Sequence, residues 1–461
     1  MTTTTVRPVV APSVGDRLDR MPITPMHRRL TGVVGIGLLF DTFENNLSGT
    51  VSKVLQNDFA FGATTLKLVL ASAFIGQFIG SLLLGRIADR YGRRRAFLVN
   101  LALYSGFSLL GAFSPNAAWL IATRFLAGIG IGAEQSLSDC YLADVLPASK
   151  RGRYTAWAYT IAFCGVPAVG FAALWLVPRS PLGLDGWRWL FVIGSLGSAV
   201  VWVLRRQLIE SPRWLAAVGR HEEAERLVAR MEAQIPAGTA RPYAEASAPA
   251  ATAAAPSAPV EPPRIRTVLQ APYRRRTVML WLVCVLSVVG YYGFGSLAPQ
   301  ILAAKGYDVV AGLGFTALSF LGYPIGSALS LPVIDRVERR TLVALSAGAM
   351  VVTGLGFAYA ASPALLILAG FCYTLVSNVF ANVSHVYLAE QYPTAIRAAA
   401  SGLAYSLSKL SAAALPFALL PVLEAYGAGP LFVVIAAAMS LLALSVLLLG
   451  ERTTGESVDR H

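Results

Sequence analysis

Two acidic residues one helical turn apart, Asp41 and Glu44, stand in an apolar stretch long enough to cross a membrane. A charge at the centre of a bilayer costs at least about 2.5–3.5 kcal/mol. Carboxylates at this spacing share a helix face, here with Asn45, and they resist joint ionisation. One of the two is therefore expected to hold a proton. The pattern indicates a proton-coupling site, although a structural ion pair with a basic residue is also compatible with it.

Arg124 is the expected partner of Asp41. It lies about 10 Å into its own apolar stretch, at roughly the depth of Asp41. Protonation of Asp41 would release the arginine and act as a switch, whereas a permanent ion pair would be structural. Gly128 and Gly132 continue the helix face of Arg124, and small residues at this spacing predict close helix packing.

Lys409 points to the substrate. It lies about 20 Å into an apolar stretch, near the middle of the membrane, with Tyr405 one turn away. A cation at this depth needs an anionic partner, because water does not solvate it there. A substrate carboxylate is one such partner, and a salt bridge to Glu44 is the alternative.

Polar side chains recur at helical spacing in two further apolar stretches. Such stripes indicate either a wet cavity or hydrogen bonds between helices. We expect Asn378 and Tyr292 in particular to line a cavity that binds the substrate. The stripes contain Thr374, Asn378, Asn382 and His385 in one stretch, and Tyr291, Tyr292, Ser296 and Gln300 in the other.

Three more ionisable residues are candidates for relaying protons. Glu134 lies deep in the stretch that contains Arg124, and a structural role is equally compatible with its position. Asp139 and His385 are 246 residues apart and are expected to form a pair at an inner gate, unless each is satisfied separately.

Two pairs of motifs repeat at the same 246-residue offset and predict a gate. GRIADRYGRRR (85–95) corresponds to a degenerate copy around 335–340, and YLADVLPASKR (141–151) corresponds to YLAEQYPTAIR (387–397). Asp89 is expected to accept hydrogen bonds at a helix N-terminus. Arg93 and Arg94 can reach Asp144, and Arg340 can reach Glu390. The candidate gating residues are Asp89, Arg90, Arg93, Asp144, Arg151, Asp335, Arg340, Glu390 and Arg397.

Composition and the repeat together predict an all-α integral membrane protein with twelve transmembrane helices in two six-helix bundles. The 461 residues are 55% hydrophobic and only 14% charged, whereas soluble chains carry about a quarter charged residues. The apolar stretches lie near 31–55, 64–84, 96–115, 117–146, 154–177, 186–206, 277–303, 310–334, 341–361, 363–390, 396–424 and 430–450.

The basic residues predict the orientation. Most of the Lys and Arg residues fall on one side of the twelve spans, which the positive-inside rule makes cytoplasmic. Both termini are then cytoplasmic in a multi-pass protein of a bacterial inner membrane. The net charge of +13 is therefore a topology signal, and nucleic-acid binding is not expected because no single soluble module carries the charge.

The predicted organisation has five parts. A polar leader, which we expect to be mostly disordered, precedes the first bundle. A central cytoplasmic loop with one amphipathic helix (210–231) and an Ala/Pro-rich linker (236–262) joins the bundles. The boundaries are 1–29 for the leader, 30–206 for the first bundle, 207–276 for the loop, 277–450 for the second bundle and 451–461 for the tail.

These motifs resemble the major facilitator superfamily over nearly the whole chain. The quoted loop motif, RFLAGIGIG (124–132) and ESPRWL (210–215) each match family patterns. DTFE (41–44) resembles the branch of aromatic acid and nicotinate:proton symporters and their synaptic-vesicle-protein relatives. Leu331 and Glu338 replace the glycines of the loop motif in the second half, so an asymmetric latch is expected.

The resemblance implies a secondary transporter working by alternating access between the two bundles. We expect proton-coupled import of a small organic anion, such as a benzoate-like or nicotinate-like carboxylate, by a monomer. The proton gradient takes the place of a cofactor, and no enzymatic or metal site is expected. Alternatives are a proton-coupled exporter of organic cations or drugs, a sugar or polyol porter, and a non-transporting membrane receptor.

Overall fold

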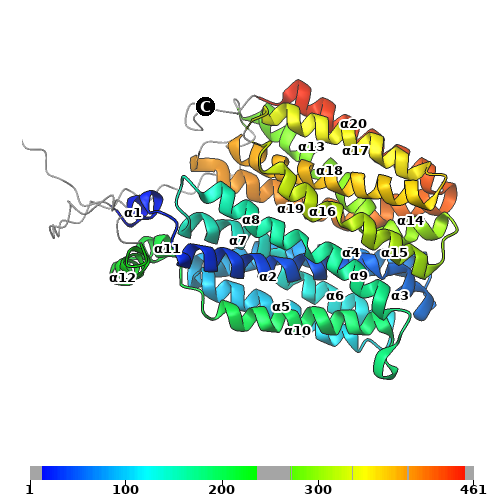
Figure 1. The fold of residues 1–461 in the computed structure, drawn as a ribbon, viewed down its shortest axis with the longest axis horizontal. Helices are drawn as coiled ribbons and strands as arrows, with labels where there is room; N and C mark the ends of the chain where they lie inside the picture. Colours follow the sequence, from blue (N-terminus) through cyan, green and yellow to red (C-terminus); the bar gives the residue numbers. More distant parts are fainter. Residues whose placement is uncertain (1–12, 236–269, 271–272, 335, 392–393, 452–461) are drawn as a thin grey trace, which may run out of the picture.

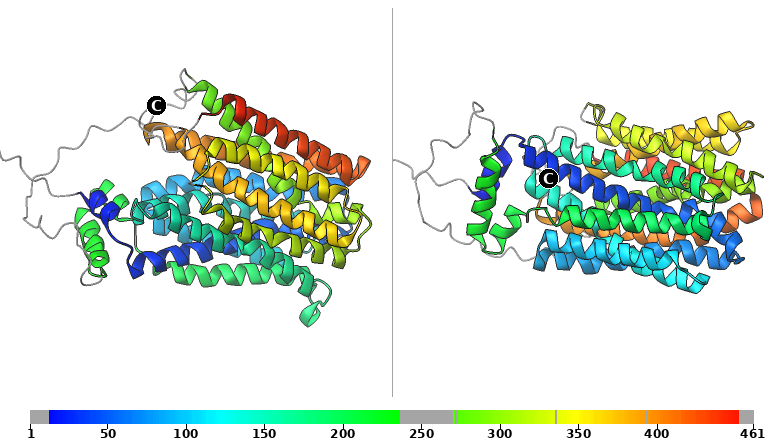
Figure 2. Two further views of the ribbon diagram at one scale, coloured as in Figure 1. Left: turned by 45° about the horizontal axis from the view of Figure 1, so that its top comes forward. Right: turned by 60° about the horizontal axis from the view of Figure 1, so that its bottom comes forward.

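The computed structural model describes residues 13–235, 270, 273–334, 336–391 and 394–451, apart from some side chains (85, 86, 89, 389, 390 and 394–402). The described chain is helical, and its long helices form two bundles that lie side by side (Figures 1 and 2). Several membrane spans consist of two consecutive helices with a break between them.

The first bundle contains α2 (Pro25–Thr50) with α3 (Ser52–Asp58), α4 (Ala63–Tyr91), α5 (Arg93–Ala112), α6 (Ala117–Gly132) with α7 (Glu134–Val145), α8 (Arg151–Phe163) with α9 (Gly165–Leu176), and α10 (Gly186–Arg205). The second contains α13 (Arg274–Gly295) with α14 (Ala298–Ala304), α15 (Val309–Phe320) with α16 (Gly322–Ser330), α17 (Arg339–Ala358), α18 (Pro363–Glu390), α19 (Thr394–Tyr426) and α20 (Ala428–Leu449).

Eleven helices or broken helices of the described chain are long and apolar enough to cross a membrane. The twelfth span is α2, whose hydropathy is lowered by the buried polar residues Asp41, Glu44 and Asn46. The twelve-helix, two-bundle architecture predicted from the sequence is therefore confirmed.

The two halves match one another closely. α5 and α17 have equal length and begin 246 residues apart, at Arg93 and Arg339. α6 and α18 begin at the same offset, and a side-chain oxygen caps each of them: Asn116 accepts from the backbone N–H of Trp119, and Ser362 caps α18 in the same way. The internal repeat read from the motifs thus extends to helix boundaries.

Three spans break four residues before a proline. Proline lacks an N–H, and its ring clashes with the carbonyl four residues earlier. Accordingly, α8 ends four residues before Pro167, α13 four residues before Pro299, and α15 four residues before Pro324. The break between α6 and α7, at Ala133, follows a glycine-rich run and has no proline.

Glycines bring α4 and α6 into backbone contact. Gly76 and Gly80 of α4 face α6, while Gly128 and Gly132 of α6 face α4. A Cβ atom on any of the four would lie less than 3.0 Å from a backbone oxygen of the opposite helix. The packing role predicted for Gly128 and Gly132 is confirmed.

The second bundle repeats this contact between α16 and α18, where Gly322 and Gly326 lie equally close to the α18 backbone. The facing positions of α18 hold Thr374 and Asn378 in place of glycine. Their side chains donate hydrogen bonds to the carbonyls of Ser319 and of the residue one turn later. Side-chain hydrogen bonds here replace part of the close backbone contact.

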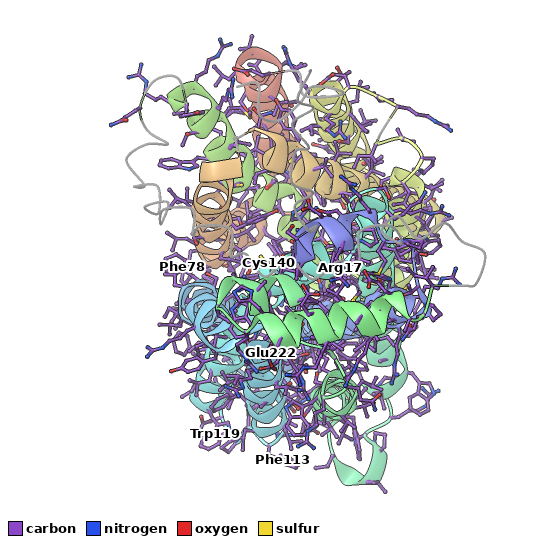
Figure 3. The ribbon with its side chains drawn as sticks, turned by 90° about the vertical axis from the view of Figure 1, so that its left-hand side faces the viewer. Arg17, Phe78, Phe113, Trp119, Cys140 and Glu222 are labelled. Atoms are coloured by element: carbon purple, nitrogen blue, oxygen red, sulfur yellow. The ribbon has the colours of Figure 1, made fainter. Side chains whose placement is uncertain are left out.

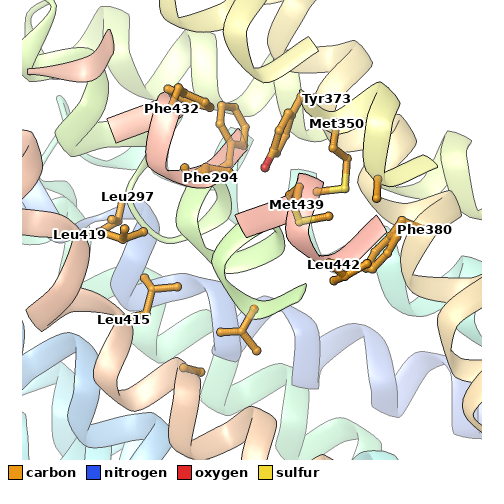
Figure 4. Packing of buried hydrophobic residues seen from close by; sticks show 14 of the residues in the cluster. Phe294, Leu297, Met350, Tyr373, Phe380, Leu415, Leu419, Phe432, Met439 and Leu442 are labelled. Atoms are coloured by element: carbon orange, nitrogen blue, oxygen red, sulfur yellow. The ribbon is translucent and has the colours of Figure 1, made fainter. Parts of the chain in front are cut away.

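A dense aromatic and aliphatic core fills the second bundle (Figure 4). Phe294 of α13 packs against Tyr373 of α18 and Phe432 of α20, with ring centroids 5.0 and 6.4 Å away. The Tyr373 hydroxyl donates to the carbonyl of Gly290 at 2.6 Å, so this buried polar group is satisfied.

A small helical layer, which we call the cap, lies at one end of the first bundle (Figure 1). It consists of α1 (Val14–Arg20), α11 (Pro212–Ala217) and α12 (His221–Glu232), and Figure 3 views the molecule from this end. The prediction of one continuous amphipathic helix was wrong, because Gly219 adopts a positive φ of 83° and separates α11 from α12. The linker at 236–262 lies outside the described residues.

The expectation of a mostly disordered leader fails from residue 13 onward. Ser13 caps α1, and its hydrogen bonds to Asp16 lower the pKa of that carboxyl. Leu18 packs against Val228 and Met231 of α12. Apolar contact and ion pairs with α12 thus order this part of the leader; the pairs join Arg17 to Glu225 and Glu232.

Gly128→Ala should destabilise the protein, since its Cβ would meet the carbonyl of Ala73. Overpacking of this kind costs about 1–3 kcal/mol. Thermal unfolding of the purified protein measures the effect. Gly106→Ala is the matched control, because a Cβ there meets nothing within 4 Å. Equal melting temperatures for the two variants would contradict the backbone contact.

Candidate substrate and proton site

A cavity of about 180 Å³ lies between the two bundles. Its lining comes from the middle of α2, α4, α13 and α19, from the break between α6 and α7, from the end of α8 farther from the cap and from the part of α18 nearer the cap. Aromatic rings, amides and a few ionisable groups face it. They include Asp41, Asn45, Asn46, Gln77, Gln135, Tyr159, Phe163, Tyr291, Tyr292, Phe380, His385, Tyr405 and Lys409.

The bundles touch one another at the end away from the cap. Gly49 of α2 lies against the backbone of Ser296, and Gly170 of α9 lies against Ala317, with no room for a Cβ at either glycine. The cavity is therefore closed off from that end.

Asp41 and Lys409 face this cavity from opposite bundles. Asp41 is 9% exposed, and its Oδ1 has no hydrogen-bond partner. Among the described residues no carboxylate forms an ion pair with Lys409. The charge of Lys409 nevertheless acts on Asp41. The cavity thus contains one acidic and one basic group that other side chains do not fully satisfy.

The expected Asp41–Arg124 pair does not form. Arg124 pairs with Glu44 at 3.1 Å, and both side chains are fully buried inside the first bundle. Ser108 donates to the other Glu44 oxygen at 2.7 Å, and Arg124 also donates to the Glu44 carbonyl at 3.0 Å. Gly194 leaves the space that the carboxylate fills. The alternative salt bridge from Lys409 to Glu44 is likewise not formed.

An amide network joins the bundles at the wall of the cavity. Gln77 of α4 donates to Asn45 at 2.7 Å, and Asn45 donates to the hydroxyl of Tyr292 in α13 at 3.2 Å. The ring of Tyr292 also packs edge-on against Phe74 and Tyr291. Asn45, Tyr291 and Tyr292 therefore lie where the sequence placed them, beside the cavity.

Three other expected lining residues lie elsewhere. Asn378 is fully buried and donates to the carbonyl of Tyr323 at 2.6 Å, and Asn382 donates to Ser330 at 2.8 Å. Gln300 is directed to Ser52, with a 3.5 Å separation, near the closed end. The alternative of hydrogen bonds between helices, rather than cavity lining, therefore describes these three side chains.

Tyr159 lies between Asp139 and His385, which do not pair directly. Its hydroxyl donates to Asp139 at 2.6 Å, and its ring stacks on that of His385 with centroids 6.5 Å apart. His385 in turn stacks on Tyr405 and is hydrogen-bonded to its hydroxyl. This chain crosses from the first bundle to the second and ends one turn from Lys409.

At the cap end, Arg93 lies 3.8 Å from Asp144, as expected, and the pair ties α5 to α7 within one bundle. Arg94 does not reach Asp144; its side chain donates to the carbonyl of Arg206. Glu210, rather than Asp89, accepts the first backbone N–H groups of α5, at 2.9 and 3.2 Å. The side chain of Asp89 lies outside the described set.

The other gating candidates are dispersed. Arg151 pairs with Asp19 of α1 at 2.9 Å, so it contacts the cap. Arg340 donates to the Leu447 carbonyl in α20 and not to Glu390, whose side chain is not described. Arg90 is exposed beside the ring of Tyr91. Asp335 and the side chain of Arg397 fall outside the described residues.

The latch is asymmetric, in agreement with the sequence. Gly92 has a φ of 101° and lies against the Glu210 carboxylate, where a Cβ would collide. The corresponding Glu338 has an ordinary φ of −55° and precedes α17. A side chain at position 92 would therefore displace the Glu210 carboxylate from the first turn of α5. In the second half, position 338 does not need a glycine.

Four side chains with contacts at or beside the candidate site or the cap end were not singled out in the sequence: Gln77, Ser108, Arg205 and Glu210. Gln77 and Ser108 are single polar residues in apolar stretches, and this isolation could have identified them as candidates for contacts inside the membrane. Arg205 lies at the end of its apolar stretch, where a basic residue usually faces the cytoplasm, yet it is fully buried.

The sugar (and other) transporter family matches residues 31–460. An inner membrane metabolite transport protein of Escherichia coli is 30% identical, with 97% of each chain covered. The niacin transporter NiaP of Acinetobacter baylyi is 27% identical over 96% of this chain and 98% of its own. The fold is similar to that of the xylose transporter XylE from E. coli, with a TM-score of 0.75, 20% identity and coverage of 93% and 99%. The chain belongs to this transporter family of the major facilitator superfamily and is a multi-pass membrane transporter of a small molecule, not an enzyme.

Proposed function

We propose that the chain imports a small organic anion together with protons, and that the anion is an aromatic or heterocyclic carboxylate resembling benzoate or nicotinate. The observation that carries the proposal is the cavity that holds Lys409, Asp41 and several aromatic rings together. Lys409 would bind the carboxylate, and Asp41 would carry the coupling proton. The cap would lie on the cytoplasmic side of the inner membrane.

The size of the cavity supports a ligand with a single ring. An apolar cavity of about 150 Å³ in another protein binds benzene, and this cavity measures about 180 Å³. Tyr159, Phe163 and Phe380 offer ring faces and edges that favour aromatic stacking. Lys409 supplies a charge-assisted hydrogen bond, which is stronger than a neutral one.

Coupling follows from the two ionisable groups that share the cavity. While Asp41 is ionised, it compensates the charge of Lys409 across the cavity. When Asp41 is protonated, Lys409 needs another anion, which the substrate carboxylate supplies. Proton and anion would therefore enter the site together. Glu44 and Arg124, which satisfy one another, would hold the neighbouring helices in place.

Two relatives point to different substrates. The niacin transporter favours a heterocyclic carboxylate, whereas the xylose transporter and the family description favour a sugar. The amides of Asn45, Gln77 and Gln135 at the cavity wall would suit hydroxyl groups, so a sugar or polyol is the second candidate. An organic cation is disfavoured because Lys409 would repel it.

Lys409→Ala should weaken carboxylate binding about 10–100-fold, since hydrogen bonds to charged groups contribute about 1.5–3 kcal/mol. Thermal shifts of purified protein with nicotinate, benzoate, xylose and tetraethylammonium measure binding, because a ligand stabilises the fold that it binds. Lys67→Ala, which removes a lysine outside the cavity, is the control. If xylose alone stabilised the protein, and if Lys409→Ala left that stabilisation unchanged, the sugar porter would be favoured.

Asp41→Asn should abolish accumulation of the anion driven by a pH gradient, because the amide cannot release a proton. Uptake of labelled nicotinate or benzoate into proteoliposomes, with and without an imposed gradient, measures this. Asp185→Asn, which changes a half-exposed carboxylate outside the cavity that pairs with Arg188, should behave as the wild type does. Normal gradient-driven accumulation in Asp41→Asn would rule out the coupling role of this residue.

A further inference from the structure

A second buried ion pair lies in the first bundle, beside the cavity. Glu134 is the first residue of α7 and Arg205 the last of α10; both are fully buried, and they pair with one another. The Arg205 guanidinium lies 4.2 Å from the centre of the Phe97 ring. It also occupies the space beside Gly37 in α2, where any Cβ would collide with it.

This pair is an electrostatic neighbour of Asp41. Gly37 precedes Asp41 by one turn, so the guanidinium contacts α2 about 6 Å along the axis from Asp41. Gln135, next to Glu134 in the chain, lines the cavity together with Asp41. The charges of Glu134 and Arg205 both act on Asp41. Two carboxyl groups and one guanidinium thus form a single cluster.

The hydrogen bonding of this pair differs from that of Glu44–Arg124. Glu44 accepts from both Ser108 and Arg124. In Arg124 only Nε lacks a partner. Arg205 and Glu134 are in contact, but among the described residues neither oxygen of Glu134 and no side-chain nitrogen of Arg205 has an aligned hydrogen-bond partner. A buried pair that served only to hold helices together would be expected to satisfy these atoms. The geometry therefore leaves Glu134 and Arg205 able to change partners.

We propose that Glu134 and Arg205 form a second proton-transfer site, which exchanges the coupling proton with Asp41; this rests on the proton coupling proposed above. In this step the O–H bond of the Asp41 carboxyl breaks and an O–H bond forms on the Glu134 carboxylate. The negative charge passes to Asp41, and Arg205 turns from Glu134 to Asp41. The charge of the cluster does not change, and no other reactant is consumed.

The step moves the proton toward the cap. Asp139 follows Glu134 by five residues, about 7.5 Å along α7, and is held by Tyr159. The other ionisable groups around the cluster are Glu44 on α2, Tyr104 on α5 and Lys409 on α19. Helix breaks at ion sites are common in transporters, and α7 begins at Glu134 directly after such a break.

Infrared titration of the purified protein tests the proposal without any substrate. The carbonyl band of a protonated buried carboxyl that disappears in Asp41→Asn belongs to Asp41. In Glu134→Gln the pH midpoint of that band should shift, because its proton-sharing partner is gone. Glu424→Gln, which alters an exposed carboxylate of α19, should leave it unchanged. An identical titration in wild type and Glu134→Gln would overturn the proposal.

Transport separates this relay from a structural role. In Glu134→Gln, gradient-driven accumulation of nicotinate or benzoate should fall far more than exchange at equal pH on both sides, and its pH profile should flatten. A parallel loss of both, with lowered thermal stability, would show a structural pair. If Glu134→Gln does not fold, Glu134→Gln/Arg205→Gln removes both charges and takes its place. Wild-type protein that transports neither anion would refute the proposed substrate class, while the infrared titration would still show whether Asp41 and Glu134 titrate as a coupled pair.

Discussion

The cost of leaving a charge without a partner inside a membrane governs the arrangement of this transporter. In the first bundle two ion pairs lower this cost for four of the buried charges: Glu44 pairs with Arg124, and Glu134 pairs with Arg205. Among the residues that the structure describes, Asp41 and Lys409 have no such partner within their own bundles. They face one another across the cavity between the bundles, where a transported proton or anion can neutralise their charges. Charges that are paired inside one bundle stabilise that bundle. Charges that can be neutralised only from the cavity therefore mark the proposed binding site for substrate and proton.

Much of the fold could be predicted from the sequence because the chain contains its own repeat. The motif offset fixed the number of bundles, and helix starts such as Arg93 and Arg339 follow it. The same offset pairs Asn378 with Gly132, a packing glycine. Because Gly132 was predicted to pack against a neighbouring helix, the offset would have predicted a helix contact for Asn378 as well, and not a place in the cavity.

Charge pairing could not be predicted in the same way. Asp41 and Glu44 are three residues apart, so their side chains differ by about 60° around the helix axis. That difference directs Glu44 into the bundle and Asp41 into the cavity. Which of them meets Arg124 depends on the rotation of α2 about its axis, and this rotation is set by contacts such as Gly194 against Glu44. Spacing along one helix contains no information about those neighbours.

The glycine contacts and the proline breaks have a joint mechanical consequence. Helices that meet backbone to backbone have no intervening side chains that could repack, so α4 moves with α6 and α16 with α18 as rigid bodies. Bending is then left to the spans that proline has already divided, where few helical hydrogen bonds must be given up. In one of these spans α16 lies against the α18 backbone, and Leu321 separates α16 from α15. A change of angle at Leu321 would tilt the far end of α15 relative to that pair and leave the contact beside the cavity in register.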